Sequence, residues 1–239
     1  MTDDPLLTID DVSVFYGKTQ ALSGVSVTVD RGEIVGVIGP NGAGKTTLLD
    51  AVAGFKSFGG SIRFDGIDMA RVGARGAVKE GLVYCTEDRD LFPFFSVHEN
   101  LLMGAQARDD RDAVRDDLEM VYDLFPRLEE RREQEAETMS GGEQQMLAIG
   151  RALMGDPELL MLDEPTLGLA PVIVDDISEI MERLQDEGLT ILLAEQNSTF
   201  ALRHAERLSL LENGEIQLSG SAAEFSDNEY VRDAYIGIH

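Results

Sequence analysis

The stretch Gly39-Pro40-Asn41-Gly42-Ala43-Gly44-Lys45-Thr46-Thr47 fits the pattern G-x-x-x-x-G-K-[ST], in which a glycine-rich loop wraps around phosphate groups. The apolar run Ile34–Ile38 precedes this phosphate loop and residues 46–53 have a helical pattern, so a strand, a loop and a helix follow one another. Backbone N–H groups of such a loop point at phosphate, and the helix N-terminus adds positive charge. We expect Lys45 to reach the β- and γ-phosphates and Thr46 to bind Mg²⁺. A glycine-rich turn that matches by chance is the alternative.

A second motif lies about 120 residues further on. The apolar run Leu159-Leu160-Met161-Leu162 is typical of a buried parallel strand, and it ends in Asp163 and Glu164. Carboxylates at the C-terminal ends of such strands lie where α/β sheets bind their ligands. Asp163 is therefore a candidate Mg²⁺ ligand, and Glu164 is a candidate general base for the water that attacks the γ-phosphate. Taken alone, an apolar strand that ends in Asp-Glu is more often structural.

Between these motifs lies the signature segment, Ser140-Gly141-Gly142, followed by an amphipathic helical pattern. Ser140 is suited to cap that helix, and the glycine N–H groups are suited to bind an anion. One ATP does not need two separate γ-phosphate loops from one chain. We therefore expect a head-to-tail dimer, in which the signature segment of each chain closes over the nucleotide of its partner. An ordinary helix cap is the alternative.

These motifs together resemble those of the ABC (ATP-binding cassette) ATPases, and the likeness covers nearly the whole chain. The resemblance implies ATP and Mg²⁺ as cofactors and ATP hydrolysis as the activity. It also implies that Tyr16 stacks on adenine, although Tyr16 is alternatively a strand aromatic in a small core, with Phe15 able to take its role. The nucleotide-binding residues that it implies are Tyr16, Gly39, Pro40, Asn41, Gly42, Ala43, Gly44, Lys45, Thr46, Thr47, Ser140, Gly141 and Gly142.

The chain differs from the common family pattern in three segments. In the sensor loop (residues 85–89) Glu87 occupies the place of a usual Gln, and in the switch segment (residues 193–197) Gln196 occupies the place of a usual His. Gly168 lies in the loop after Glu164, where many cassettes carry an Asp. With these matches the resemblance implies Glu164, Gln196 and Glu87 as catalytic residues and Thr46, Asp163 and Glu87 as metal ligands.

The three differences themselves resemble one subfamily, the second ATP-binding subunit of branched-chain amino acid importers. The tail Val231-Arg232-Asp233-Ala234-Tyr235-Ile236-Gly237 is also similar to the end of those subunits. The resemblance implies a second ATPase subunit, or another copy of this chain, as dimer partner. It further implies two integral membrane permease subunits and a place on the cytoplasmic face of the cell membrane. Urea and amide importers share these features, so their cassettes are an alternative.

The formal net charge of −25 is the outlying feature of the composition. The 45 acidic residues stand against only four lysines, with arginine as the other basic residue. A duplex-binding protein needs a basic face, so we expect no nucleic-acid partner. We interpret the acid excess with lysine depletion as adaptation to a salt-rich cytoplasm, where a Debye length of about 3 Å at 1 M screens self-repulsion. An ordinary acidic surface is the alternative.

Other features of the chain set limits on this reading. No apolar run approaches the roughly 20 residues that span a bilayer, and the acidic start, Met1-Thr2-Asp3-Asp4, does not resemble a signal peptide. The single Cys85 excludes an internal disulfide and is expected to fill a small space in the core.

The order of patterns predicts an α/β fold: an ABC ATPase of the P-loop class, with residues 1–239 as a single domain. Alternating residues over 6–29 and 61–65 predict an antiparallel β subdomain. The expected mixed, mainly parallel core comprises residues 34–38, 82–85, 159–162 and 190–194, with a hairpin over 208–218. Helices are expected at 46–53, 97–107, 111–124, 143–154 and 172–187, and residues 96–139 are expected to form an inserted helical subdomain.

Four large apolar side chains beside the sensor loop indicate a docking surface for a helix of a membrane subunit. They lie in the segment Leu91-Phe92-Pro93-Phe94-Phe95. A transporter ATPase is the favoured function. A non-transport ABC ATPase would need a coiled-coil insertion, a second cassette or a basic surface, and a purely structural ATP-binding module would not need the set of Lys45, Thr46, Asp163 and Glu164.

Overall fold

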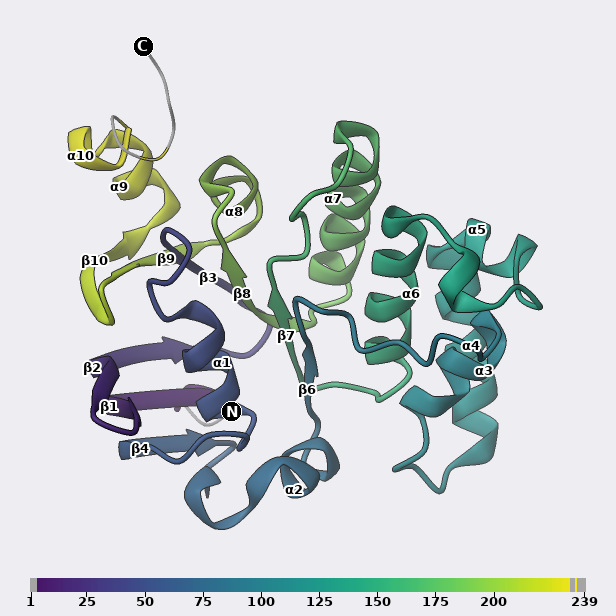
Figure 1. Cartoon of the computed structure of the whole chain (residues 1–239), viewed down its shortest axis with the longest axis horizontal. Coiled ribbons are helices and arrows are strands. Elements are labelled where there is room, and N and C mark those ends of the chain that lie inside the picture. The colour runs from purple at the N-terminus through teal and green to yellow at the C-terminus, as the bar shows by residue number, and fades with distance from the viewer. Residues whose placement is uncertain (1–3, 233–234, 236–239) are drawn as a thin grey trace.

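The computed structural model describes residues 4–232 and 235, and its central element is a six-stranded sheet (Figure 1). The strand order is β10-β9-β3-β8-β7-β6, with all neighbouring pairs parallel except β9 and β10. Strands β3, β7 and β8 are buried along their whole length because both faces of the sheet are covered. The strands are β3 (Ile34–Ile38), β6 (Leu82–Cys85), β7 (Leu159–Asp163), β8 (Thr190–Glu195), β9 (Arg207–Glu212) and β10 (Glu215–Ser221).

A second, antiparallel sheet has the order β2-β1-β4-β5. Its strands are β1 (Leu7–Tyr16), β2 (Thr19–Val29), β4 (Gly59–Phe64) and β5 (Ile67–Asp68). Residues of β2 alternate between buried and accessible over Val25–Val29, as expected for a sheet with one face packed on the core. Figure 1 shows this sheet at one end of the molecule and helices at the other.

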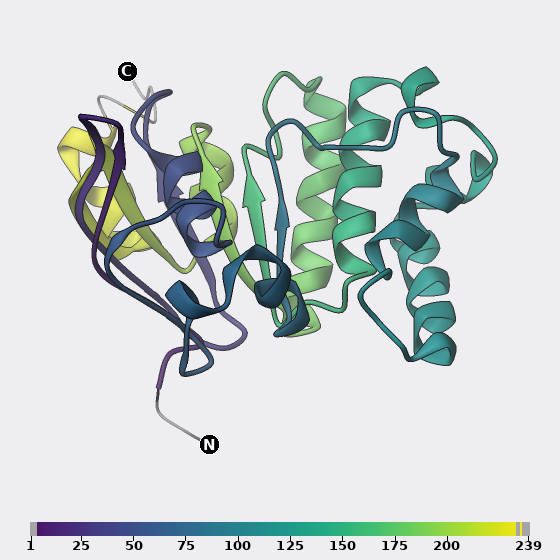
Figure 2. The same ribbon diagram turned by 60° about the horizontal axis from the view of Figure 1, so that its bottom comes forward.

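The helices cover the core sheet and extend beyond its β6 edge (Figures 1 and 2). Both views place α6 and α7 side by side, with α3, α4 and α5 at the end remote from the antiparallel sheet. The helices are α1 (Lys45–Val52), α2 (Gly73–Lys79), α3 (Val97–Gly104), α4 (Arg111–Leu124), α5 (Pro126–Glu130), α6 (Gly141–Leu153), α7 (Pro171–Asp186), α8 (Ser198–His204), α9 (Ala222–Asp227) and α10 (Glu229–Val231), with single 3₁₀ turns at Met69–Arg71 and Ala136–Thr138.

Successive residues of the core strands contribute to two separate hydrophobic clusters. Ile34 and Ile38 pack toward α3 to α8, whereas Val35 and Val37 pack toward α1 and the antiparallel sheet. This alternation follows from the two-residue period of a strand. Cys85 belongs to the first cluster, and burial raises the pKa of its thiol to about 12. Its predicted role as core filler is confirmed.

The predicted α/β class, the mixed core and the antiparallel subdomain are confirmed. Residues 34–38, 82–85 and 111–124 form elements with the predicted bounds, and the hairpin around Asn213-Gly214 is present. The sequence patterns do not predict helices α2, α5, α8, α9 and α10. Gly73 and Gly76 lower the helix propensity of α2, and α8 is only seven residues long, so tertiary contacts decide both. Among the described residues, no helix has both the length and the apolar character to span a membrane.

Candidate active site

The phosphate loop connects β3 to α1 and has backbone geometry that requires glycine. Gly44 has φ 113°, and a Cβ atom there would lie 2.7 Å from Cδ2 of Leu22. A Cβ atom at Gly39 would lie 2.1 Å from the carbonyl oxygen of Leu211. Because both positions exclude a side chain, the backbone can approach a bound phosphate closely. A cavity of about 660 Å³ opens here, lined by Thr19, Gln20, Ala21, Asn41, Gly42, Gly44, Lys45, Thr46, Thr47, Glu87, Glu164, Asn213 and Gly214.

Lys45 is the buried cation of this cavity. Its Nζ atom donates to the carbonyl oxygen of Gly39 at 2.7 Å and lies 2.9 Å from Oε1 of Glu164. Both ionic side chains are about 5% exposed. The predicted phosphate-binding lysine and the predicted general base are therefore brought together, although they lie far apart in the sequence.

Asp163 is buried at the end of β7, with only 1% of its surface exposed. Its Oδ2 atom accepts a hydrogen bond from the Tyr84 hydroxyl at 3.1 Å, and its Oδ1 atom has no hydrogen-bond partner among the described residues. Burial raises the pKa of Asp163 to about 6, against the lowering effect of its hydrogen bonds. A buried carboxylate oxygen without a donor is a suitable ligand for a divalent cation.

The surroundings of Asp163 fit a magnesium ion that is held together with a nucleotide. Within residues 4–232 and 235, no three His, Cys, Asp or Glu side chains are grouped as a metal site. A nucleotide-bound Mg²⁺ takes only one or two protein ligands, because phosphate and water supply the others. Two of the predicted metal ligands, Thr46 and Glu87, line the cavity, and Asp163 is buried directly before Glu164, which also lines it.

Glu164 follows Asp163 in a left-handed backbone conformation with φ 48°. Its N–H group donates to the carbonyl oxygen of Ala194 at 2.8 Å, which continues the pairing of β7 with β8. Its Oε2 atom accepts a hydrogen bond from the backbone N–H of Gln196 at 3.0 Å. The carboxylate thus faces the cavity at a fixed place.

Gln196 lies next to Glu164 through its backbone, and its side chain is exposed. The residue that caps the following helix is Asn197, whose Oδ1 atom accepts from the N–H of Phe200 at 3.1 Å, so Gln196 does not have this structural role. Gly168, the third difference from the family, has φ 69° and would strain any other residue. The catalytic role that the family resemblance implies for Gln196 stays a prediction.

Tyr16 lies beside the phosphate loop. Its hydroxyl is 3.4 Å from Oγ1 of Thr47, and Nζ of Lys56 lies 4.9 Å from the centre of its ring. The ring is about half exposed, as expected for a surface that receives a planar ligand. Phe15 is also exposed, so the alternative in which Phe15 takes the role of Tyr16 in stacking on adenine stays open.

The signature segment lies at the N-terminus of α6 and does not line the cavity that contains Lys45. Ser140 caps this helix: its Oγ atom accepts from the N–H of Glu143 at 3.4 Å and donates to Oε2 of the same residue at 2.7 Å. A Cβ atom at Gly142 would lie 2.9 Å from Ile173, so the packing of α6 on α7 requires glycine. One chain therefore does not bring the two predicted phosphate-binding segments together.

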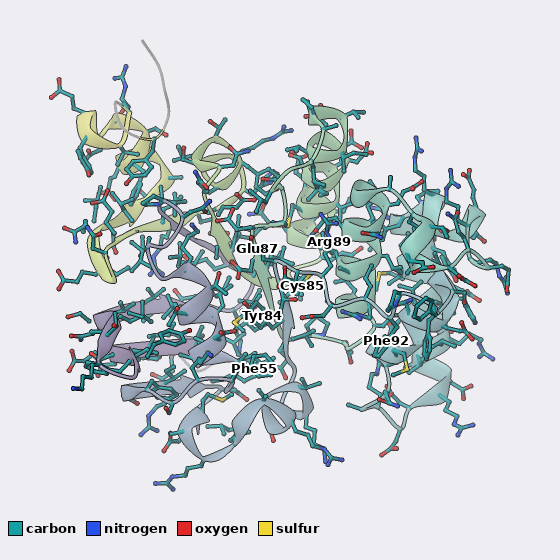
Figure 3. All side chains as sticks on the ribbon, in the orientation of Figure 1. Phe55, Tyr84, Cys85, Glu87, Arg89 and Phe92 are labelled. Atoms are coloured by element: carbon teal, nitrogen blue, oxygen red, sulfur yellow. The ribbon has the colours of Figure 1, made fainter. Side chains whose placement is uncertain are left out.

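The sensor loop holds an arginine whose role the sequence did not reveal. Figure 3 shows Tyr84, Glu87 and Arg89 along this segment, in the middle of the molecule. The Arg89 side chain donates to Oε1 of Gln145 on α6 at 2.8 Å. In return, Arg151 of α6 donates to the carbonyl oxygens of Arg89 and Asp90, both at 2.7 Å. Two arginines thus fasten the loop to the helix that carries the signature segment.

The sequence reasoning also missed Glu195, which is fully buried although it lies in the switch segment. The available signal was its place at the end of an apolar strand, as for Asp163. The part of the tail at Asp233, Ala234, Ile236 and Gly237 lies outside the described residues.

The chain is similar to one protein-family model, to known transport proteins and to solved structures. The family model described as "ABC transporter" matches residues 22–167. The high-affinity branched-chain amino acid transport ATP-binding protein BraG of Pseudomonas aeruginosa is 49% identical, over 97% of this chain and all of that protein. The lipopolysaccharide export system ATP-binding protein LptB of Escherichia coli is 34% identical over 97% of each chain. Among solved structures, the ADP conformation of MJ1267, an ATP-binding cassette of an ABC transporter, superposes with a TM-score of 0.84 at 26% identity, covering 98% of this chain and 100% of that one.

Proposed function

Because the chain belongs to the ABC transporter family of ATPases, we propose that it is the ATP-hydrolysing subunit of an importer for branched-chain amino acids. The observation that carries the site assignment is the 2.9 Å contact of Lys45 with Glu164 in one cavity, next to the buried carboxylate of Asp163. The identity of 49% to BraG supports the amino acid as solute, against 34% to LptB. The cassette of a urea or amide importer is the second candidate.

The chemistry follows from the placement of these groups. The phosphate loop and Lys45 bind and orient the β- and γ-phosphates of ATP, and Tyr16 stacks on the adenine. Mg²⁺, held by Thr46, Asp163 and Glu87, would neutralise charge that develops on the phosphates. Glu164 accepts a proton from the attacking water, and Gln196 contacts the γ-phosphate by hydrogen bonding. Binding and hydrolysis then change the spacing between two cassettes.

We propose a head-to-tail dimer with a second ATPase subunit or with another copy of this chain. The separation of the signature segment from the cavity of its own chain supports this arrangement. In the dimer, Ser140, Gly141 and Gly142 of each chain contact the nucleotide of the other. The amide N–H groups at the start of α6 are suited to a γ-phosphate.

Two permease subunits are the proposed membrane partners, which would place the chain on the cytoplasmic face of the cell membrane. The exposed aromatic surface next to the sensor loop supports docking of a permease helix. Phe94 is 72% exposed, and Phe92 and Phe95 stack with ring centres 5.1 Å apart. Figure 3 shows Phe92 and Phe55 on either side of Tyr84. Residues 96–139, which follow this surface, are the proposed inserted helical subdomain.

The net charge of −25 supports a further proposal, that the chain works in a salt-rich cytoplasm. Screening at molar salt reduces the repulsion between surface carboxylates. The binding of ATP is compatible with this charge because Lys45 and aligned N–H groups set the potential locally.

Reconstitution tests the proposed function. The complex isolated with an affinity-tagged chain is placed in proteoliposomes, and ATP-dependent uptake of labelled leucine, isoleucine and valine is compared with uptake of urea. We expect amino acid uptake that stops when Lys45→Ala replaces the wild-type chain. Uptake of urea alone would reassign the solute, and a complex without integral membrane subunits would reject the transport function.

A further inference from the structure

Glu195 ends β8 as a fully buried carboxylate for which the proposed function has no use. Three N–H or O–H groups point at it. Its Oε1 atom accepts from the N–H of Thr166 at 3.0 Å and from the hydroxyl of Thr166 at 2.7 Å. Its Oε2 atom accepts from the N–H of Asn197 at 2.9 Å. The two oxygens therefore hold two different loops.

The same two loops are joined a second time by Glu164. Strands β7 and β8 are neighbours, and Asp163 pairs with Ala194, so Glu164 and Glu195 are the next residues on adjacent strand ends. Glu164 accepts from the N–H of Gln196 in the loop after β8, while Glu195 accepts from Thr166 in the loop after β7. Each carboxylate thus holds the loop that follows the neighbouring strand.

Burial of the Glu195 carboxylate costs free energy that a neutral side chain at the same place would not cost. Among the ion pairs of residues 4–232 and 235, Lys45 pairs with Glu164 and none involves Glu195. Burial raises the pKa of Glu195 to about 7, while the groups donated by Thr166 and Asn197 oppose this rise. All three partners are donors, an arrangement that suits the ionised form. A buried carboxylate without a cation is retained where its hydrogen bonds fix a specific geometry.

We propose that Glu195 is a positioning residue for ATP hydrolysis: by holding Thr166 and Asn197, its carboxylate sets the spacing between Glu164 and Gln196. This inference rests on the proposed role of Glu164 as general base. Glu164 has a left-handed backbone, and Thr166 is the anchor that fixes the chain two residues beyond it. Asn197 in turn fixes the chain one residue beyond Gln196. Without Glu195, only the contacts of Glu164 with Ala194 and Gln196 hold the two turns together among the described residues, so Thr166 and Asn197 lose their shared anchor.

The test compares five variants in the assembled ATPase dimer, one of them Glu164→Gln, with kcat, KM for ATP and the thermal midpoint measured for each. Glu195→Gln replaces one acceptor oxygen by a donor. Thr166→Val removes only the hydroxyl bond, and Thr166→Ser restores it. Glu33→Gln is the control for a buried carboxylate outside the site: Glu33 accepts from the N–H of Asp30 at 2.9 Å and pairs with Arg207 at 3.2 Å, and it precedes β3 at the end remote from the phosphate loop.

We expect Glu195→Gln to lower kcat by about 100-fold and Thr166→Val by about 10-fold, because small misplacements of a reacting group have effects of this size. KM for ATP should stay within about 2-fold of wild type, since Glu195 is fully buried and does not line the cavity. Thr166→Ser should recover most of the loss.

The outcomes separate this inference from the proposed base. If Glu164→Gln arrests turnover while Glu195→Gln and Thr166→Val keep the kcat of Glu33→Gln, the positioning role is overturned. If Glu164→Gln keeps its turnover, the assignment of the base fails instead. Should Glu195→Gln not fold, the contrast of Thr166→Val with Thr166→Ser decides, and equal kcat values for the two contradict the inference.

Discussion

The edge of the core sheet where β7 and β8 end is fixed by buried contacts, whereas the signature segment is connected to the sensor loop by contacts nearer to water. At the sheet edge, Lys45, Asp163, Glu164 and Glu195 are all at most 5% exposed. At the other region, Arg89, Gln144 and Arg151 are half-buried and Asp90 is exposed, and only Gln145 among the contacting side chains is buried. Buried polar contacts open together with the core, while accessible ones exchange readily with water.

This difference indicates a division of tasks within the cassette. The groups assigned to chemistry keep their geometry because the sheet holds them. The sensor loop and α6 are joined by reciprocal arginine contacts, so we expect them to move as one body relative to the sheet. A shift of the exposed aromatic surface at Phe92 would then be passed to Ser140 through this body.

The largest effect is expected at the sheet edge. Glu164→Gln keeps the shape and removes the charge of the proposed base, so turnover should fall by about 10²–10⁴ while Mg-ATP still binds. Lys45→Ala should weaken ATP binding itself through loss of a charge-assisted phosphate contact. Hydrolysis assays with nucleotide titration and size-exclusion chromatography measure both effects, and we expect Glu164→Gln to accumulate a closed dimer. Wild-type hydrolysis in Glu164→Gln would reject the assignment.

A smaller effect is expected from loosening the connected body. Arg89→Ala should lower the kcat of the dimer by about 10-fold, because misplacement of the signature segment or of Glu87 affects closure over ATP. Arg89→Lys should not restore the rate, since lysine lacks the planar fork that reaches two glutamines. Arg115→Ala on the exposed side of α4 is the control. Equal rates for the Arg89 and Arg115 variants would show that the loop and α6 act separately.

Gln196 lies at the boundary of the two regions, and its effect should be smaller still. Loss of one neutral hydrogen bond corresponds to about 10-fold at most, so Gln196→Ala should reduce the rate of a mixed dimer within that range. Gln196→His adds a titratable group and should raise activity if this chain is the weaker hydrolytic partner. ATPase assays of the chain alone and with its partner cassette test both changes. Unchanged rate and ATP affinity in Gln196→Ala would make Gln196 a bystander.

The smallest effect is expected from salt, which should stabilise the exposed, charged parts of the chain more than the buried sheet edge. Raising KCl toward molar levels should raise the thermal midpoint through screening of surface carboxylates. Hydrogen exchange should slow more in the charged helix α4 than in the buried strand β7, because buried groups are screened less. Chloride is preferable to sulfate, which also strengthens apolar burial. A flat or falling midpoint contradicts salt adaptation.

The parts of the fold that the sequence predicts well are those with a strong local pattern. The continuous apolar runs of β3, β6 and β7 identify the core, and the phosphate loop between Ile38 and Lys45 places the site. Motif and strand end are local signals, so Lys45 and Glu164 could be predicted before their 2.9 Å contact was seen.

Other parts of the site depend on contacts between distant segments. Glu195 looks like a polar residue at an exposed strand end, and only its hydrogen bonds to Thr166, 29 residues away, explain its burial. Arg89 meets Gln145 across 56 positions, with a left-handed backbone that no local pattern indicates. Periodicity carries no information on such pairings.

The burial of Cys85 has a practical consequence for measuring the closure of two cassettes over ATP. The chain has one cysteine, and burial raises the pKa of its thiol to about 12, so maleimide reagents would meet almost no thiolate there. A single cysteine introduced at an exposed position of α4 can therefore be labelled selectively without removing Cys85. Pairs of such labels across the two cassettes would report closure as a measured distance distribution.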